Sequence, residues 1–412
     1  MMSPRLIVLI LSLLLGIQPI TTDLYLPALP TMTAELDAPV ALGQLTLGAM
    51  LLAFGASQLI WGPLSDRFGR RPVLLVGLSL YTLAALASTF ADTMMQLVVW
   101  RAVQGAAMGA SVMCARAIVR DLYTPEVAAR VMSKGFSGLG VIACLSAPLG
   151  GLLTDAFGWR ASLLMLAVFG ALTLALLVLR FEETVREPNP RALQPTMLVK
   201  IWGHILSRHA FWSFALLAAA TYGGLFTFLA ASPFVLIEIH GVPRTAYGFW
   251  MASMSAAYLF GTFMCRRLLI RFGVRQTVAI GGLFSLAGGT SFGVLALAGV
   301  HGIWAIMVPQ YLFMLGHGVH QPCGQSGAVA PFPYAAGAAS ALCGFLMMLA
   351  AFAMGLWLGA AMDGTPFPMT NGMWFWGVAT AAVAWLLVWR TEEVRLPDEQ
   401  RVQAPRETGA DG

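Results

Sequence analysis

Residues 62–75, GPLSDRFGRRPVLL, form a short polar loop between two apolar stretches of the chain. The stretches on either side, residues 41–61 and 73–90, are each long enough to cross a bilayer as a helix. A related loop, Arg271-Phe-Gly-Val-Arg275, separates two apolar stretches much later in the chain. The recurrence of R-F-G-x-R between paired apolar stretches predicts a membrane protein built from a duplicated unit.

The composition predicts that such spans recur along the whole chain. Of the 412 residues, 58% are hydrophobic and only 10% are charged. Apolar stretches of about 20 residues are the signature of membrane-spanning helices. We predict twelve spans, at residues 6–32, 41–61, 73–90, 94–118, 132–154, 161–179, 211–237, 246–265, 276–298, 302–324, 336–360 and 372–389.

The distribution of basic residues predicts the orientation of these spans. When the spans are threaded alternately, all 24 lysines and arginines except Arg101, Arg160 and Arg244 fall on one side of the membrane. Because positive loops remain in the cytoplasm, both chain ends are predicted to be cytoplasmic. The net charge of +5 is then a consequence of topology, and nucleic-acid binding is excluded because no soluble segment is large enough to form a domain.

A charged, proline-containing segment separates six predicted spans from the other six. We therefore predict an all-α integral membrane fold with two six-helix halves, residues 1–180 and 209–390, related by pseudo-two-fold symmetry. Residues 181–208 form the cytoplasmic linker and residues 391–412 a cytoplasmic tail. The first span is predicted to be broken by Pro19, Pro27 and Pro30, and the seventh by Gly223, Gly224 and Pro233. Broken helices at matching positions point to a substrate site near the membrane midplane.

Several motifs resemble those of the major facilitator superfamily. The loop matches the superfamily's cytoplasmic signature at every defining position, and Arg101-Ala-Val-Gln104-Gly105 resembles its R-x-x-Q-G motif. Three further stretches resemble the drug/proton antiporter branch, and within it the bicyclomycin/chloramphenicol-resistance (Bcr/CflA) group. They are Thr22 to Pro30, Arg116 to Asp121 and Ala330 to Ser340.

The resemblance implies a cytoplasmic gate formed by the loop, with Gly62, Asp66, Arg67, Gly69, Arg70 and Arg71 as its residues. It also implies an antiporter signature in the fifth span, of which this chain keeps Pro148 and Gly151 and places Gly150 one position early. Alanines replace the first two glycines of that signature, so the match is partial. The second half has Ile270 in place of Asp66, so the predicted gate is asymmetric.

Asp23 and Arg101 are the two acidic or basic residues (Asp, Glu, Lys, Arg) that lie clearly inside predicted spans. A charge at that depth costs roughly 2.5–3.5 kcal/mol on insertion scales, so it usually faces a partner or a water-filled cavity. Both residues are predicted at a similar depth, which allows a charge pair, either direct or bridged by water. Proton coupling needs a carboxylate that changes protonation during transport, and Asp23 is the candidate. The alternative is that Asp23 caps a helix end near the interface.

Further polar, aromatic and methionine side chains are candidates for the substrate cavity. His317 and His320 lie at positions i and i+3, but no further metal ligand accompanies them, so we predict polar cavity lining and no metal site. The complete set of predicted cavity residues is Gln18, Tyr25, Gln104, Met108, Tyr222, Phe226, His317 and Gln321.

The leading interpretation is a proton-driven multidrug exporter of the bacterial inner membrane that works by alternating access. Its expected partners are protons, membrane lipid and small amphipathic drugs such as chloramphenicol-like compounds, and it is expected to act as a monomer without a cofactor. A metabolite carrier on the same fold is the alternative. A membrane-embedded enzyme or receptor would need a catalytic constellation or a signalling domain, and neither is visible in the sequence.

Overall fold

Apolar stretches form helices in a membrane because a helix satisfies every backbone polar group within one segment. The computed structural model describes residues 2–185, 189–190, 192–300 and 302–391, and these residues form helices and turns without a strand. The helices are α1 (Pro4–Asp23), α2 (Leu29–Glu35), α3 (Val40–Phe68), α4 (Arg70–Thr89), α5 (Met94–Leu122), α6 (Pro125–Phe157), α7 (Trp159–Arg180), α8 (Pro195–Leu206), α9 (His209–Ser232), α10 (Arg244–Leu297), α11 (Ile303–Val329), α12 (Ala336–Ala361) and α13 (Phe367–Ala382). Two short 3₁₀ turns, η1 (Leu26–Ala28) and η3 (Pro333–Ala335), and two π-helical segments, η2 (Pro233–Ile239) and η4 (Val383–Val388), complete them.

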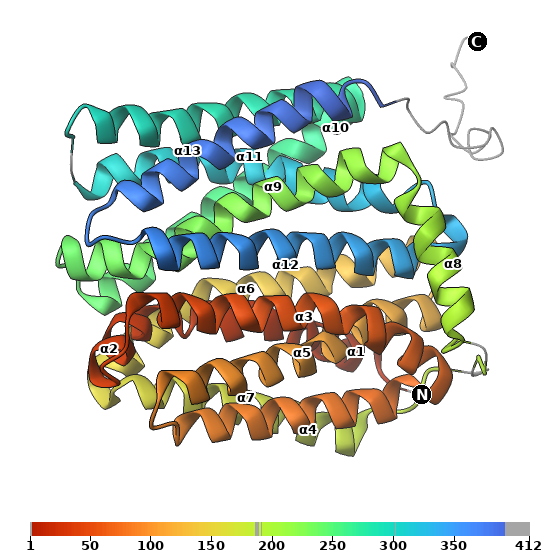
Figure 1. Cartoon of the computed structure of the whole chain (residues 1–412). Helices are drawn as coiled ribbons and strands as arrows, with labels where there is room; N and C mark the ends of the chain where they lie inside the picture. Colours follow the sequence, from red (N-terminus) through yellow and green to blue (C-terminus); the bar gives the residue numbers. More distant parts are fainter. Residues whose placement is uncertain (1, 186–188, 191, 301, 392–412) are drawn as a thin grey trace, which may run out of the picture.

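The long helices run side by side in one elongated bundle (Figure 1). Helices α1 to α7 gather on one side of the bundle and α9 to α13 on the other, while α8 crosses between the two groups at one end. We call this end, which carries α8 and the 66–71 loop, the linker end. Helix α2 lies at the opposite end.

Ten helical stretches of the described chain are long and apolar enough to cross a membrane by length and composition. The difference from the predicted twelve has two causes. Helix α10 is continuous in hydrogen bonding through Leu297 and contains two predicted spans, which meet at Gly273, where φ is 73° and ψ is −178°. Helix α11 coincides with the predicted span 302–324, but its histidines, glutamines and glycines lower its hydropathy.

The predicted break in the first span is present but lies beyond Pro19. Helix α1 runs through Pro19 and ends at Asp23, and the short turn η1 follows before α2. The predicted break of the seventh span is wrong at Gly223 and Gly224, because α9 is continuous through both glycines, but α9 ends before Pro233, where the π-helical segment η2 begins. A Cβ atom at Gly223 would lie 2.6 Å from the Trp376 ring, so this glycine allows close packing rather than a bend.

The linker contains a helix that the sequence analysis did not predict. Helix α8 packs against the starts of α9 and α12, and the His204 ring meets the Phe332 ring edge-on at 6.0 Å. The second part of the predicted linker is thus a helix that is packed against the bundle.

Candidate functional site

Asp23 is the last residue of α1 and lies where helices of both groups meet. Its side chain is half-buried, and the Thr22 hydroxyl donates a hydrogen bond of 2.9 Å to Asp23 Oδ1. The carboxylate is within electrostatic range of the Cys144 thiol on α6 and of the Tyr222 and Tyr247 hydroxyls on α9 and α10. An ionisable group therefore sits at the contact between the two sides of the bundle, with part of its surface exposed.

Arg101 is completely buried within the first group of helices. Its guanidinium donates from Nη1 to Gln104 Oε1 at 2.7 Å and from Nη2 to the Thr21 carbonyl at 2.9 Å. The Tyr25 ring covers the guanidinium, with 4.3 Å between Cζ and the ring centroid. The Nε atom has no hydrogen-bond partner among the described residues. Arg101 is thus held by neutral groups and a π face.

A direct Asp23–Arg101 ion pair, one of the two predicted forms of the charge pair, is not formed in this conformation. Within the described part of the chain, no ion pair of 4.0 Å or less joins these two side chains. Similar predicted depth does not determine which face of a helix a side chain occupies. Arg101 instead binds the backbone two residues before Asp23.

The predicted cavity residues divide into two groups. Tyr25 and Gln104 are fully buried and contact Arg101, and Met108 is fully buried on the same helix as Arg101. The others lie on the first helix and on the α9–α13 side. Gln18 is half-buried beside the Tyr222 hydroxyl, Phe226 packs against Gly355 of α12, and Gln321 lies near Met347.

Three residues that support the Arg101 cluster were missed in the sequence. The Thr21 hydroxyl hydrogen-bonds to the Tyr81 hydroxyl at 2.7 Å, and the Tyr25 hydroxyl hydrogen-bonds to Thr46. No local signal marks these residues, because isolated hydroxyl side chains are common in membrane helices and their partners lie on other helices.

The two histidines of α11 have different surroundings. The His320 ring is fully buried and has partners on both nitrogens, the Ser285 hydroxyl at 3.3 Å and the Val278 carbonyl at 3.1 Å. His317 Nδ1 lies 2.9 Å from the Thr221 hydroxyl, and its ring lies 5.4 Å from the Tyr258 ring. His320 is therefore a packing residue whose tautomer is fixed by a carbonyl, while His317 joins α11 to α9.

At the linker end, the 66–71 loop forms an ionic network around Arg70. This buried side chain donates to Ser65 Oγ at 2.6 Å, to Asp66 Oδ1 at 2.7 Å and to Asp121 Oδ2 at 2.9 Å. Arg120 approaches the same Asp66 oxygen at 3.7 Å. Arg70 thus ties the loop to the end of α5. Arg67, in contrast, is exposed and lies over the Phe68 ring.

Glu183, a residue that the sequence analysis missed, caps the start of α4. Its carboxylate accepts hydrogen bonds of 2.8–3.0 Å from the backbone N–H groups of Arg70, Arg71, Thr184 and Val185. Partial burial opposes ionisation, but these backbone hydrogen bonds outweigh it and hold the pKa of Glu183 below its usual range. The carboxylate also complements the positive end of the helix dipole.

Gly69 makes this cap possible. Its φ of 99° and ψ of 161° belong to a backbone region that is essentially restricted to glycine. A Cβ atom here would lie 2.5 Å from Glu183 Oε2. Gly62 lies inside α3. A Cβ at this position would be in ordinary contact with the Met113 methyl, at 3.4 Å.

The glycine-rich stretch of α6 joins the two sides of the bundle at the opposite end. A Cβ at Gly151 would lie 2.5 Å from the Arg244 carbonyl, and one at Gly150 would overlap the Leu24 carbonyl. Pro148 lies directly against Gly248 of α10. The missing side chains therefore let α6 approach α1 and α10 at backbone distance.

Arg244 stabilises this contact with hydrogen bonds and an ion pair. Its guanidinium binds Asp155 of α6 at 3.2 Å and Thr31 of α2 at 3.0 Å, and the neighbouring Thr245 hydroxyl donates to Asp155 at 2.8 Å. Toward the linker end the same face of α6 is open. A Cβ at Gly140, about three turns from Gly151, would meet no atom within 4 Å. Helices α6 and α10 are thus joined at the opposite end, while there is free space beside α6 at Gly140.

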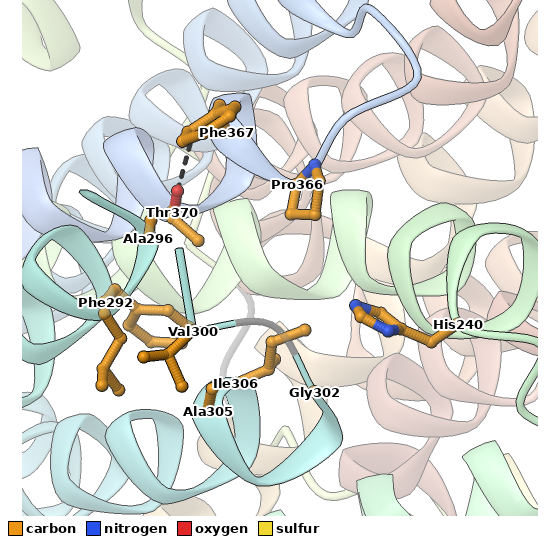
Figure 2. Close-up of a pocket in the computed structure, with 11 residues that line it drawn as sticks. His240, Phe292, Ala296, Val300, Gly302, Ala305, Ile306, Pro366, Phe367 and Thr370 are labelled. Carbon is orange, nitrogen blue, oxygen red and sulfur yellow. Dashed lines mark hydrogen bonds between the residues drawn. The ribbon is translucent and has the colours of Figure 1, made fainter. Parts of the chain in front are cut away.

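A separate apolar pocket lies on the α9–α13 side (Figure 2). It is lined by Phe292, Ile306 and Phe367, with His240 and Thr370 among the polar residues at its wall. None of the predicted cavity residues lines it. It is therefore distinct from the Asp23 region.

Comparisons with known proteins agree with this arrangement. Residues 11–243 match the family model of the Major Facilitator Superfamily. The chain is 31% identical to "Multidrug resistance protein D" of Escherichia coli over 340 residues, which cover 82% of this chain and 85% of that protein. It is 27% identical to the "Bicyclomycin resistance protein homolog" of Haemophilus influenzae over 368 residues, 89% of this chain and 92% of that protein.

Among solved structures, the fold is similar to that of a D-xylose-proton symporter. The TM-score is 0.73 at 17% sequence identity, and the match covers 94% of this chain and 97% of the symporter. This likeness shows the fold. Together with the family model and the sequence relatives, it confirms the family that the loop motif indicated. The chain belongs to the major facilitator superfamily of membrane transporters.

Proposed function

We propose that the protein is a proton-driven exporter of amphipathic small molecules, including chloramphenicol-like drugs, across the bacterial inner membrane. Membership of the superfamily and the drug-resistance names of its relatives support this function. In the proposed topology, α10 contributes two spans and α11 one, giving twelve. The two halves are residues 1–180 and 209–390, the linker end and both termini are cytoplasmic, and the protein works as a monomer.

The position of Asp23 carries the proposal. It is the acidic residue inside the predicted spans, and it lies half-buried among α6, α9 and α10, at the contact between the two halves. When the halves rearrange, the water contact of this carboxylate changes, so it can bind a proton on one side and release it on the other. A bound drug that displaces the proton would give exchange.

Arg101 has a supporting role in this proposal. A guanidinium remains charged and therefore does not carry the proton. Its hydrogen bond to the Thr21 carbonyl holds the end of α1, on which Asp23 lies. Arg101 thus positions the helix end that carries the proton-binding residue.

The contact between α6 and α10 at one end supports alternating access. Arg244, Asp155 and the glycines of α6 close the periplasmic end in the proposed orientation, and there is free space beside α6 at Gly140, toward the cytoplasm. Pro148, Gly150 and Gly151 are therefore proposed as part of the periplasmic closure. The network of Arg70 with Asp66 and Asp121 is proposed as the cytoplasmic gate.

Transport in proteoliposomes with an imposed pH gradient tests the function. Wild-type protein should accumulate chloramphenicol against its gradient, and Asp23→Asn should abolish this accumulation because the neutral amide binds no proton. Asp92→Asn removes an exposed carboxylate outside the long helices and is the matched control. Accumulation by Asp23→Asn at the wild-type rate would reject the proton-carrier role, while pH-independent transport of metabolites by wild type would favour the metabolite carrier.

A further inference from the structure

Two stretches that the sequence analysis singled out meet in the structure. Arg116 belongs to the stretch at the end of α5, and Ser340 belongs to the stretch that opens α12. Arg116 Nη1 donates a hydrogen bond of 2.8 Å to Ser340 Oγ. This bond connects the α1–α7 side with the α9–α13 side near the linker end (Figure 1).

Arg116 has no carboxylate partner among the described residues. The nearby acids are already engaged, since Asp66 and Asp121 bind Arg70 and Glu183 binds backbone N–H groups. Residues 209–390 contain two acids, Glu238 and Asp363, and both lie toward the opposite end. The half-buried Arg116 guanidinium is therefore paired with one neutral hydroxyl, although it has five N–H donors.

The position of Arg116 on α5 relates it to the central site. Residues 101, 104, 108, 112 and 116 follow at helical spacings of three and four, so they share one face of α5. Arg116 lies roughly 22 Å along the helix axis from Arg101, toward the linker end. In the cytoplasmic orientation of the proposed function, a molecule coming from the cytoplasm would pass Arg116 before it reaches the region of Asp23.

We propose that Arg116 is a binding site for an acceptor oxygen of the transported molecule, and that Ser340 occupies this site until the molecule replaces it. The proposal rests on the proposed export function and narrows its substrate class to amphipathic molecules with a nitro, carbonyl or carboxylate oxygen. An oxygen that carries more negative charge than a hydroxyl forms the stronger charge-assisted bond. Replacement of Ser340 also breaks a bond between the two sides of the bundle, so substrate binding loosens the contact at the linker end.

Equilibrium binding to the purified protein in detergent tests this site with two probes. Chloramphenicol carries nitro and amide oxygens, whereas tetraphenylphosphonium is a cation without an acceptor. Arg116→Gln should weaken chloramphenicol binding by about tenfold, the loss expected for one charge-assisted hydrogen bond. Tetraphenylphosphonium binding should be unchanged or tighter. Ser340→Ala, which removes the competing hydroxyl, should tighten chloramphenicol binding or leave it unchanged.

Arg130→Gln provides the control, because it removes an exposed arginine of α6 that belongs to no contact used here and should change neither probe. The proposal is overturned if Arg116→Gln weakens both probes equally, since that result indicates a structural role. It is also overturned if Ser340→Ala weakens chloramphenicol as strongly as Arg116→Gln. If wild type binds tetraphenylphosphonium but not chloramphenicol, the acceptor class is wrong, while proton-driven transport of the cation would leave the export function intact.

Discussion

The two R-F-G-x-R loops have the same backbone shape but different chemistry. Gly69 and Gly273 both have positive φ values, 99° and 73°, with ψ near 180°. In both loops an arginine lies over the following phenylalanine, at 5.3 Å for Arg67 and 5.2 Å for Arg271. The glycine and the arginine–phenylalanine pair therefore determine the turn.

The ionic network is present in the first loop alone. Where the first loop has Asp66 and Arg70, the second has Ile270 and Val274. Ile270 is 90% exposed, and in the described residues no ion pair involves the second loop. The two loops share the turn, whereas the ion pairs of the first loop depend on Asp66 and on Asp121 of α5. The turn therefore forms without the ion pairs, which are found in the first loop.

The largest effect should come from removing the centre of the network. Arg70→Ala leaves the largely buried Asp121 carboxylate without its cation, and loss of one partner of a buried ion pair costs roughly 3–5 kcal/mol. The matching Val274→Ala removes a partly exposed apolar side chain and should cost at most about 0.5 kcal/mol. Denaturant unfolding in detergent micelles measures both values. Similar losses for the two variants would show that the network does not distinguish the loops.

An intermediate effect should come from the turn itself. Gly69→Ala and Gly273→Ala each force alanine into a glycine region of the backbone, at roughly 1–3 kcal/mol. Gly69→Ala should be the more harmful variant, because its methyl group also collides with Glu183. Thermal unfolding of the two variants side by side gives the difference. A larger loss for Gly273→Ala would mean that the cap contributes nothing.

The smallest effect should come from Glu183→Gln, which keeps the shape of the cap and removes its charge. At neutral pH the cost should be about 1 kcal/mol, as for other helix N-caps. Because the native pKa of Glu183 is lowered, its carboxylate stabilises the fold above its ordinary pKa of 4.5, and this stabilisation is lost as pH falls through the native pKa. Unfolding curves of wild type and variant should therefore converge below about pH 4.5. A gap that stays constant down to pH 3.5 would contradict the role of the charge.

The sequence was sufficient to predict the helical membrane fold, the family and the polar loop. These features depend on local patterns, namely apolar length, the distribution of arginines and a contiguous motif. Glu183 could not be predicted, because it lies more than a hundred residues after Arg70 and follows a helix without any motif. Glu183 reaches the start of α4 because α7 packs beside α4 in the folded protein.

The absence of a direct Asp23–Arg101 ion pair shows that a similar predicted depth in the membrane does not determine which side chains meet. Arg101 binds the Thr21 carbonyl, and Asp23 follows two residues later. Two residues along an α-helix turn a side chain by roughly 200°, so neighbours at equal depth can point in opposite directions. Helix rotation depends on packing, and the packing around α1 involves Tyr81 and Gly150, which come from distant parts of the sequence.

The attachment of the segment after α7 to the first loop sets the length of chain that connects the α1–α7 side to α8. Glu183 binds the start of α4, and the Asn189 backbone N–H donates to the Asp66 carbonyl at 2.9 Å. The connection to α8 is therefore measured from Asn189, which is held by Asp66, and not from Arg180 at the end of α7. At about 3.3–3.6 Å per residue, this shortens the maximum reach to Pro195 from roughly 50 Å to roughly 20 Å. The same contacts that hold the loop thus restrict how far α8 can move away from the start of α4, and their release would lengthen that distance.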